Sequence, residues 1–407
     1  MPTHSYELLA DRYIILRAPT RQQADFQSPL IAMPEAVPDV QIDIDDHVNK
    51  HTMKTLINDS TVVGFSPVMP MKLIEPVELG GQEQSNDDGP GATSENQATW
   101  GIEAVGATTS PFTGAGITIA VLDTGIDADH EAFTGVDLVT KDFTTSGSAH
   151  DDHGHGTHCA GTIFGREVNG TRIGVAPGVT RAVIGKVLGP DGGSSDLLTE
   201  AMIWARDNGA HAISMSLGID FPGYVEWLIS TRGVPLKVAT SIALYDYAAN
   251  VKLFETLSQF LAAGVGQPLV VAASGNESAR DATPPYELNV APPASAVGIV
   301  AVGAVAQATA DLDIAPFSNT RATVVAPGVG VISAKAGGGL RSLNGTSMAT
   351  PHAAGVAALW AEKLALNGQL TPLSLQSKLI GSASFDSLVS SIDPLDVGSG
   401  LVRAPQT

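Results

Sequence analysis

The segment Ile117-Thr-Ile-Ala-Val-Leu-Asp-Thr-Gly125 sets the fold class. It is a short apolar run that ends at Asp123 and a Thr-Gly pair, as a buried strand of a parallel sheet does. Apolar runs of similar length recur at residues 182–187, 212–215, 269–273, 297–305 and 323–326, with helical segments between them. This alternation predicts βαβ units, an α/β fold and a mainly parallel, buried sheet.

Composition limits the classes of function. The chain has 407 residues, with 22 Lys and Arg against 42 Asp and Glu, so its formal net charge is −20. Nucleic acids and anionic lipids need a basic face, and this acidity argues against both. The single cysteine, Cys159, excludes an internal disulfide and a Cys-based zinc cluster. No signal peptide or membrane-spanning run is visible, so the cytoplasm is the default location, with secretion still open.

A polar stretch divides the chain. Residues 81–98, GQEQSNDDGPGATSENQA, have almost no large apolar side chains and predict a linker that contains a processing region. Within residues 1–80, strand-like runs at 12–17, 40–44, 61–65 and 71–74 accompany a helix that Asp45 or Asp46 caps and that reaches about Leu56. These predict a small α+β (ferredoxin-like) domain, and residues 99–407 form the second domain.

Four segments of the second domain hold residue types that do chemistry. Asp123 ends a strand, and in parallel sheets ligands bind beyond the carboxyl ends of strands. His155 begins a helix rich in small residues, where an imidazole oriented by a carboxylate can act as a general base. Ser347 precedes an Ala-rich helix whose N-terminus favours a developing oxyanion. Asn276 follows a buried strand and a glycine, which leaves its amide free to donate a hydrogen bond.

Simpler interpretations exist for each of these segments. Asp123 and Ser347 suit turn or helix caps, and Asn276 suits a turn. A zinc site in a metallohydrolase is a further alternative, with four histidines as its ligands: His150, His153, His155 and His158. Their spacing matches no familiar ligand motif, and the Glu of a helical His-Glu-x-x-His is missing.

Taken together, Asp, His and Ser in that chain order and within these motifs resemble the subtilisin-like serine proteases (subtilases), over roughly residues 100–402. The resemblance implies a serine endopeptidase on a doubly wound sheet with helices on both faces. It implies Ser347 as the nucleophile, His155 as the general base and Asp123 as the residue that orients His155. Asn276 and the Ser347 backbone N–H would form the oxyanion hole. His158 is similar to the second, structural histidine of the family.

The resemblance also implies two strands that bind an extended peptide substrate between them. The stretch Ser214-Met-Ser-Leu-Gly218 is similar to the strand that walls the first specificity pocket, and Gly192-Gly-Ser194 is similar to the opposite edge. Leu217 and residues 272–275 suggest an apolar pocket. The substrate-binding residues predicted in this way are Gly192, Gly193, Ser194, Ser216, Leu217, Gly218 and Gly275. Ordinary glycine-rich loops are the alternative.

Residues 1–80 fit the family's propeptide by position, size and α+β pattern. Such a domain would template the folding of a non-local parallel sheet and act as an intramolecular inhibitor until it is cut in the linker. The alternative for these residues is a permanent regulatory or partner-binding domain. For the whole chain, the alternative function is a catalytically silent or permanently self-inhibited binding protein of the same fold.

Three features depart from the family pattern. An insert at about residues 219–265 begins with a loop-like stretch, 221–235, and continues with helical spacing at 238–263. It either caps the cleft or adds a helix at the sheet edge. Cys159 lies one helical turn after His155, as in the proteinase-K-like branch, which predicts a buried thiol and sensitivity to mercurials.

The third departure concerns calcium, which many relatives bind. Ala132 stands where they have a liganding Asp, and the region expected to complete that site contains Arg166 and Arg172. The usual calcium site therefore looks incomplete, and we expect that no cofactor is required.

Overall fold

A computed structural model describes residues 12–18, 40–79, 97–263 and 268–407. Its largest sheet among these residues has eight strands in the order β15-β14-β13-β11-β6-β9-β7, with β16 also paired to β14. These strands are β6 (Thr118–Asp123), β7 (Asp137–Asp142), β9 (Arg181–Lys186), β11 (Ala212–Met215), β13 (Leu269–Ala273), β14 (Ile299–Gln307), β15 (Leu312–Ile314) and β16 (Val324–Pro327). All neighbouring pairs are parallel except β14 with β15. The predicted mainly parallel α/β sheet is confirmed.

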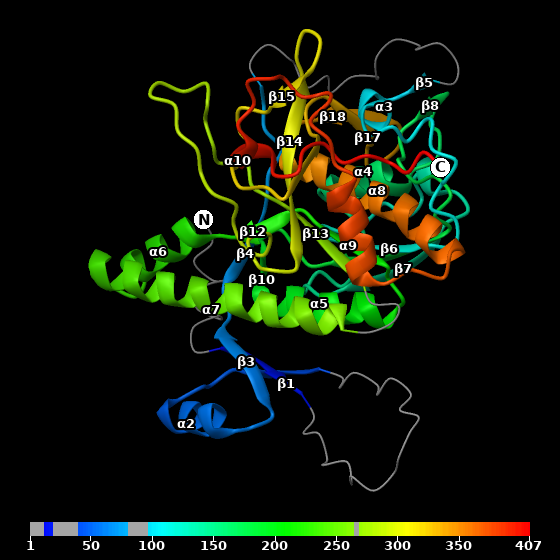
Figure 1. The fold of residues 1–407 in the computed structure, drawn as a ribbon. Helices are drawn as coiled ribbons and strands as arrows, with labels where there is room; N and C mark the ends of the chain where they lie inside the picture. Colours follow the sequence, from blue (N-terminus) through cyan, green and yellow to red (C-terminus); the bar gives the residue numbers. More distant parts are fainter. Residues whose placement is uncertain (1–11, 19–39, 80–96, 264–267) are drawn as a thin grey trace, which may run out of the picture.

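Helices cover both faces of this sheet (Figure 1). Every residue of β6 is buried, and its side chains alternate between two apolar cores. Ile119 and Val121 belong to the core that includes α4 (His155–Phe164) and α8 (Thr346–Leu366), whereas Ala120 and Leu122 belong to the core that includes α5 (Ser195–Asp207) and α7 (Leu236–Ala262). Burial on both faces explains why the strand sequences are continuous apolar runs rather than alternating ones.

Shorter elements complete the second domain. They are β5 (Gln97–Ala98), α3 (Trp100–Ala104), the 3-10 helix η1 (Glu131–Phe133), β8 (Thr171–Arg172), β17 (Val331–Ala334), β18 (Leu340–Leu343), α9 (Pro372–Gly381) and α10 (Pro394–Val397). Among the described residues, no helix combines the length and apolarity that crossing a membrane requires.

The N-terminal residues form a small antiparallel sheet in the order β2-β1-β3, with strands β1 (Tyr13–Arg17), β2 (Gln41–Asp45) and β3 (Val62–Pro67). Helix α2 (Lys50–Asn58) accompanies it, which agrees with an α+β pattern. The predicted helix cap was wrong: Asn49, not Asp45 or Asp46, accepts the hydrogen bond from the His51 N–H at 2.8 Å. Asp45 instead closes a turn with the N–H of His47. A full ferredoxin-like topology would involve residues 19–39, which lie outside the described residues.

Strand β4 (Pro70–Leu73) follows β3 in the chain but is not part of the small sheet. It pairs with strands of the second domain. It pairs antiparallel with β10 (Gly193–Ser194) on one side and with β12 (Leu217–Ile219) on the other. Met71 lies opposite Gly193, and Lys72 lies opposite Gly218. The sequence pattern correctly indicated a strand at 71–74 but assigned it to the N-terminal domain, because its partners lie far away in the sequence.

The insert is a pair of helices, α6 (Phe221–Ser230) and α7. The predicted loop at 221–235 was wrong over most of its length, because Asp220 caps α6 and Pro222 falls in the first turn, where proline is tolerated. The predicted helix at 238–263 is confirmed. Helix α7 lies between the small sheet and the second domain (Figure 1), and Asn250 on it donates a 2.8 Å hydrogen bond to the carbonyl of Pro67. The insert therefore supports the N-terminal sheet.

Candidate active site

Asp123 and His155 form a buried pair at the carboxyl edge of the sheet. Asp123 is the last residue of β6, and His155 is the first residue of α4. Their side chains are 1% and 0% exposed, and Asp123 Oδ1 lies 2.8 Å from His155 Nδ1. An imidazole whose Nδ1 is held by a carboxylate presents Nε2 as the nitrogen that accepts a proton. The pair therefore has the geometry of an oriented general base.

The surroundings of His155 favour its protonated form. Burial disfavours the imidazolium, but the charge of Asp123 and the Cys159 thiol outweigh it and raise the pKa of His155 well above its usual value. Cys159 is buried, with Sγ 3.7 Å from His155 Nδ1 and 3.4 Å from the Ser347 carbonyl oxygen. Burial raises the pKa of the Cys159 thiol. The thiol is buried beside the proposed base, as expected, and its sensitivity to mercurials stays a prediction.

A second buried carboxylate, Asp151, joins the loop after β6 to the start of α4. Its Oδ1 accepts hydrogen bonds from Thr124 Oγ1 at 2.8 Å and from the Gly154 N–H at 2.7 Å. Its Oδ2 accepts from both the N–H and the hydroxyl of Thr157. Burial opposes ionisation, but these hydrogen bonds lower the pKa of Asp151. Sequence reasoning missed this positioning residue, although its place in the histidine motif was the available signal.

Ser347 and Asn276 lie against the N-terminal segment. Ser347 is fully buried in the first turn of α8, and its hydroxyl donates a 2.7 Å hydrogen bond to the carbonyl of Ile74. Asn276 Oδ1 accepts hydrogen bonds from the N–H and hydroxyl of Thr346, which fixes the amide. Its Nδ2 then donates to the carbonyl of Glu75 at 2.8 Å. The serine and the amide donor therefore bind two consecutive carbonyls.

This division of the two carbonyls has a chemical consequence. Acyl transfer to a serine needs one carbonyl whose carbon faces the hydroxyl and whose oxygen reaches the amide donor. Here Ser347 bonds to one carbonyl and Asn276 to the next, and within the described residues His155 Nε2 has no hydrogen-bond partner. No peptide bond is therefore poised for attack in this state.

The two predicted substrate strands bracket β4. Gly193 and Ser194 form β10, whereas Leu217 and Gly218 belong to β12. The carbonyl of Ser216 accepts the N–H of Ile74 at 3.3 Å. The sequence-predicted edges thus lie on either side of one extended segment, which continues to Val77, where the backbone N–H donates to the Asn344 carbonyl at 2.8 Å.

Two predicted glycines lie at close approaches. Gly192 has φ +86°, and a Cβ on it would lie 2.7 Å from the carbonyl oxygen of Met71. Gly275, with φ +111°, would bring a Cβ within 2.3 Å of Asn319 Nδ2, directly before Asn276. Side chains at either position would therefore displace the strand or the amide donor.

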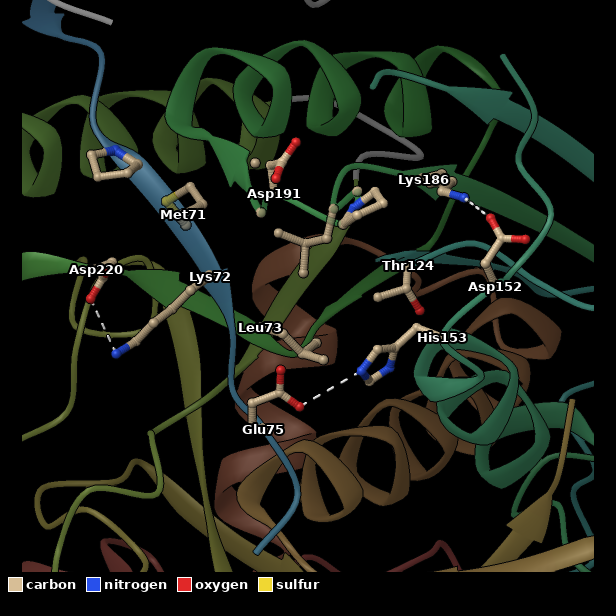
Figure 2. A pocket seen from close by; sticks show the side chains of 16 residues that line it. Met71, Lys72, Leu73, Glu75, Thr124, Asp152, His153, Lys186, Asp191 and Asp220 are labelled. Atoms are coloured by element: carbon tan, nitrogen blue, oxygen red, sulfur yellow. Dashed lines mark hydrogen bonds and ion pairs between the residues drawn. The ribbon is translucent and has the colours of Figure 1, made fainter. Parts of the chain in front are cut away.

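The apolar pocket predicted from Leu217 and residues 272–275 stays a prediction; next to it, the Ile74 side chain is buried, 3.9 Å from the position of a Cβ on Gly218. A cavity of about 580 Å³ lies beside β4 (Figure 2). Figure 2 shows Glu75 and His153, which both line this cavity, pointing toward one another, with 3.8 Å between Oε2 and Nε2. Residues on both sides of the cavity come from β4 and from the loop at 188–193.

The four histidines of the zinc alternative do not form a metal site in the described part of the chain. His158 Nε2 bonds to the carbonyl of Val331 at 3.0 Å, and burial together with Arg341 lowers the pKa of His158 to about 3. His153 is half-exposed. Among the described residues, the one group with possible ligand atoms close together is Asp123, His155 and Cys159. Its Asp and His are already bonded to one another.

Two arginines lie in the region that was expected to complete the usual calcium site of the family. Arg166 donates to the carbonyls of Phe164, Pro177 and Val179. Arg172 donates to the carbonyls of Ala107, Gly174 and Val175. A calcium ion needs such oxygens for itself, and two guanidinium charges beside it would repel it. The residues present therefore do not fit a calcium ion at this loop.

Comparison with known proteins gives consistent matches. The model of the subtilase family matches residues 114–400. Alkaline elastase YaB of Bacillus sp. (strain YaB) is 34% identical over 352 residues, which cover 84% of this chain and 79% of that protein. Subtilisin BL of Lederbergia lenta is 34% identical over 314 residues, 75% of this chain and 96% of that protein. The cuticle-degrading protease of Metarhizium anisopliae is 32% identical over 303 residues, 72% and 67% of the two chains.

The substitution Gly156→Ala tests whether the close contact between α4 and the loop after β6 positions Asp123 against His155. A Cβ on Gly156 would lie 2.2 Å from the carbonyl oxygen of Gly125 and 3.3 Å from the Asp123 Cβ. Because it must separate Asp123 from His155, we expect kcat/KM on a peptide substrate to fall by about 10²-fold. Gly381→Ala is the control, since its Cβ would meet nothing within 4 Å. A Gly156→Ala protein with wild-type kcat/KM would show that this close contact does not position the pair.

Proposed function

Because the chain belongs to the subtilase family and is a serine endopeptidase, we propose that it cleaves peptide bonds through an acyl-enzyme on Ser347. In this proposal His155 takes the Ser347 proton as general base and later protonates the leaving amine as general acid. Asp123 orients His155 and stabilises its charged form. The observation that supports this most is the buried 2.8 Å bond between Asp123 and His155, beside a peptide segment bound against Ser347.

The remaining roles follow from the same cleft. Asn276 and the backbone N–H of Ser347 would hold the oxyanion, and the fixed amide of Asn276 supports this role. Removing this donor from a related subtilisin slows turnover about 10²- to 10³-fold, and we expect the same order for Asn276→Ala. β10 and Ser216-Leu217-Gly218 would bind the substrate backbone.

We also propose that the N-terminal domain is an intramolecular inhibitor of this cleft. Three contacts support the proposal. β4 pairs with both substrate edges, Asn250 on α7 bonds to the chain just before β4, and Arg12 forms a 2.9 Å ion pair with Asp196, which is buried at the start of α5. Together these contacts attach both the small N-terminal sheet and the chain that follows it, including β4, to the second domain.

The site of self-processing needs a revised proposal. The predicted processing region, 81–98, lies outside the described residues except for β5. The peptide carbonyls next to Ser347 belong to Ile74 and Glu75. Between the two adjoining bonds, Ile74–Glu75 is favoured, because the nitrogen of the intact Glu75–Pro76 bond belongs to a proline ring, which fixes φ and leaves no N–H there. We propose a cut after Ile74, once a small shift brings its carbonyl to Asn276.

A permanently self-inhibited protein is the second candidate. The observation that favours it is the division of the two carbonyls between Ser347 and Asn276, which leaves neither bond poised for attack. The cellular location stays a prediction, and neither the structure nor the relatives support the cytoplasmic default.

Self-processing can be followed by intact mass spectrometry of the wild type and of Ser347→Ala. We expect the wild type alone to yield a fragment that ends at Ile74, because the cut needs the nucleophile. A Ser347-dependent cut within 81–98 would support a zymogen but contradict the proposed site. An uncut wild type that also fails to cleave peptides would favour the permanently inhibited protein.

The pH profile tests the role of His155. Only the neutral imidazole accepts a proton, so kcat/KM should rise with pH and reach half of its maximum above the ordinary histidine pKa of about 6.5. Asp123→Asn removes the charge that raises this pKa, so the midpoint should move to lower pH, and turnover should fall by about 10⁴-fold as in other Asp-His-Ser proteases. His153→Gln, which alters an exposed histidine, should leave the midpoint in place. A midpoint that Asp123→Asn does not move would contradict the assignment.

Calcium independence is tested by thermal unfolding. Because Arg166 and Arg172 already satisfy the carbonyls of their loop, we propose that the chain needs no calcium there, and Tm should be the same in calcium and in chelator. Arg172→Gln should destabilise the protein by about 1–3 kcal/mol, since several buried carbonyls lose their donor. A large calcium-dependent rise in the wild-type Tm would overturn the proposal.

A further inference from the structure

A charged residue of β4 meets a charged residue of the cleft. Within β4, Met71 and Leu73 are buried, whereas Lys72 between them is 43% exposed. Lys72 Nζ lies 3.3 Å from Asp220 Oδ1, and the Asp220 side chain is only 15% exposed. Figure 2 shows the two charged ends facing one another beside the strand. This ion pair is a side-chain contact between the bound segment and the second domain, in addition to the backbone pairing.

Asp220 is held in place by the second domain and by the strand's backbone. Its N–H donates a 3.0 Å hydrogen bond to the carbonyl of Pro70, and its side chain accepts from the N–H of Gly223 as the cap of α6. The carboxylate therefore sits at a fixed place between the end of β12 and the insert. It does not depend on a mobile loop for its position.

We propose that Asp220 selects substrates that carry a basic side chain at the position of Lys72. This inference rests on the proposed function, in which a substrate peptide replaces β4 between β10 and β12. Main-chain pairing fixes the register, so the substrate residue opposite Gly218 must face Asp220 just as Lys72 does. The substrate class is then an extended peptide with an apolar, a basic and two more apolar residues, as in Met71 to Ile74.

The size of the effect follows from the exposure of the pair. Partly exposed ion pairs contribute modestly, so a basic residue should be favoured over alanine by about threefold to fivefold in kcat/KM. An acidic residue at this position is repelled and should be cleaved more slowly than alanine. Because salt screens exposed charges, the preference should shrink as ionic strength rises.

The experiment uses the full-length protein and three chromogenic substrates, Pro-Met-X-Leu-Ile-p-nitroanilide with X as Lys, Ala or Glu. Ratios of kcat/KM within one preparation do not depend on the fraction of enzyme whose cleft is free. We expect the order Lys, Ala, Glu in the wild type. In Asp220→Asn, which keeps a helix-capping side chain, the three values should converge, and in Asp220→Lys the order should reverse.

Two controls separate the charge effect from a general change in the cleft. Asp191→Asn removes an acid that lines the same cavity, and it should leave the Lys-to-Ala ratio unchanged. Replacing the leucine of the peptide by alanine should lower kcat/KM equally in the wild type and in Asp220→Asn.

The outcomes distinguish this inference from the proposed function. Cleavage of all three peptides with ratios that Asp220→Asn or high salt do not alter would overturn the role of Asp220 and leave the proposed function intact. If Asp191→Asn also lowers the ratio of kcat/KM for the Lys peptide to that for the Ala peptide, the preference comes from the overall negative charge of the cavity and not from recognition by Asp220. If none of the peptides is cleaved, both the proposed function and this inference fail.

Discussion

The shared carboxyl edge of the parallel strands places every group of the site. Asp123 ends β6, Ser216 follows β11, and Asn276 comes three residues after β13, so three segments far apart in the sequence meet at one edge. The N-terminus of α8 then brings Ser347 to the same place. Parallel strands impose this arrangement because each must return to the opposite edge before the next begins. A lost strand register would therefore separate the proposed base from the nucleophile.

The same edge binds the chain's own N-terminal segment. β4 satisfies the open backbone groups of β10 and β12, while the Ile74 side chain is buried beside Gly218 and Ser347 bonds to the Ile74 carbonyl. An unpaired strand edge readily takes up an extended chain, and here the chain supplies one itself. The helices of the insert add to this attachment, since α7 lies between the small sheet and the second domain (Figure 1) and Asn250 on it bonds to the carbonyl of Pro67. The proposed inhibition and the proposed substrate recognition would thus share one set of contacts.

The sequence predicted the α/β sheet, which is confirmed, and it indicated the candidate site residues; both predictions depend on short motifs. A buried strand appears in the sequence as a continuous apolar run. The motifs around Asp123, His155, Asn276 and Ser347 each contain a glycine within two residues of the polar side chain. The partners of β4 were not predictable, because pairing over more than a hundred residues leaves no local signal. α6 was missed because Pro222 and Gly223 indicate a loop, and only the Asp220 cap shows a helix start. Asp220 gains its proposed role from three-dimensional contacts alone, whereas Asp151 lies in the histidine motif and only its hydrogen bonds needed the structure.

The proposed chemistry depends on an acyl-enzyme that forms on Ser347 in this cleft. It is tested by treating the full-length protein with a serine-directed fluorophosphonate while it hydrolyses a peptide, and by mapping the adduct with mass spectrometry. We expect a single adduct, on Ser347, and a loss of hydrolysis in proportion to it. Hydrolysis that continues with Ser347 fully modified, or that stops with the adduct on another residue, would show that Ser347 is not the nucleophile.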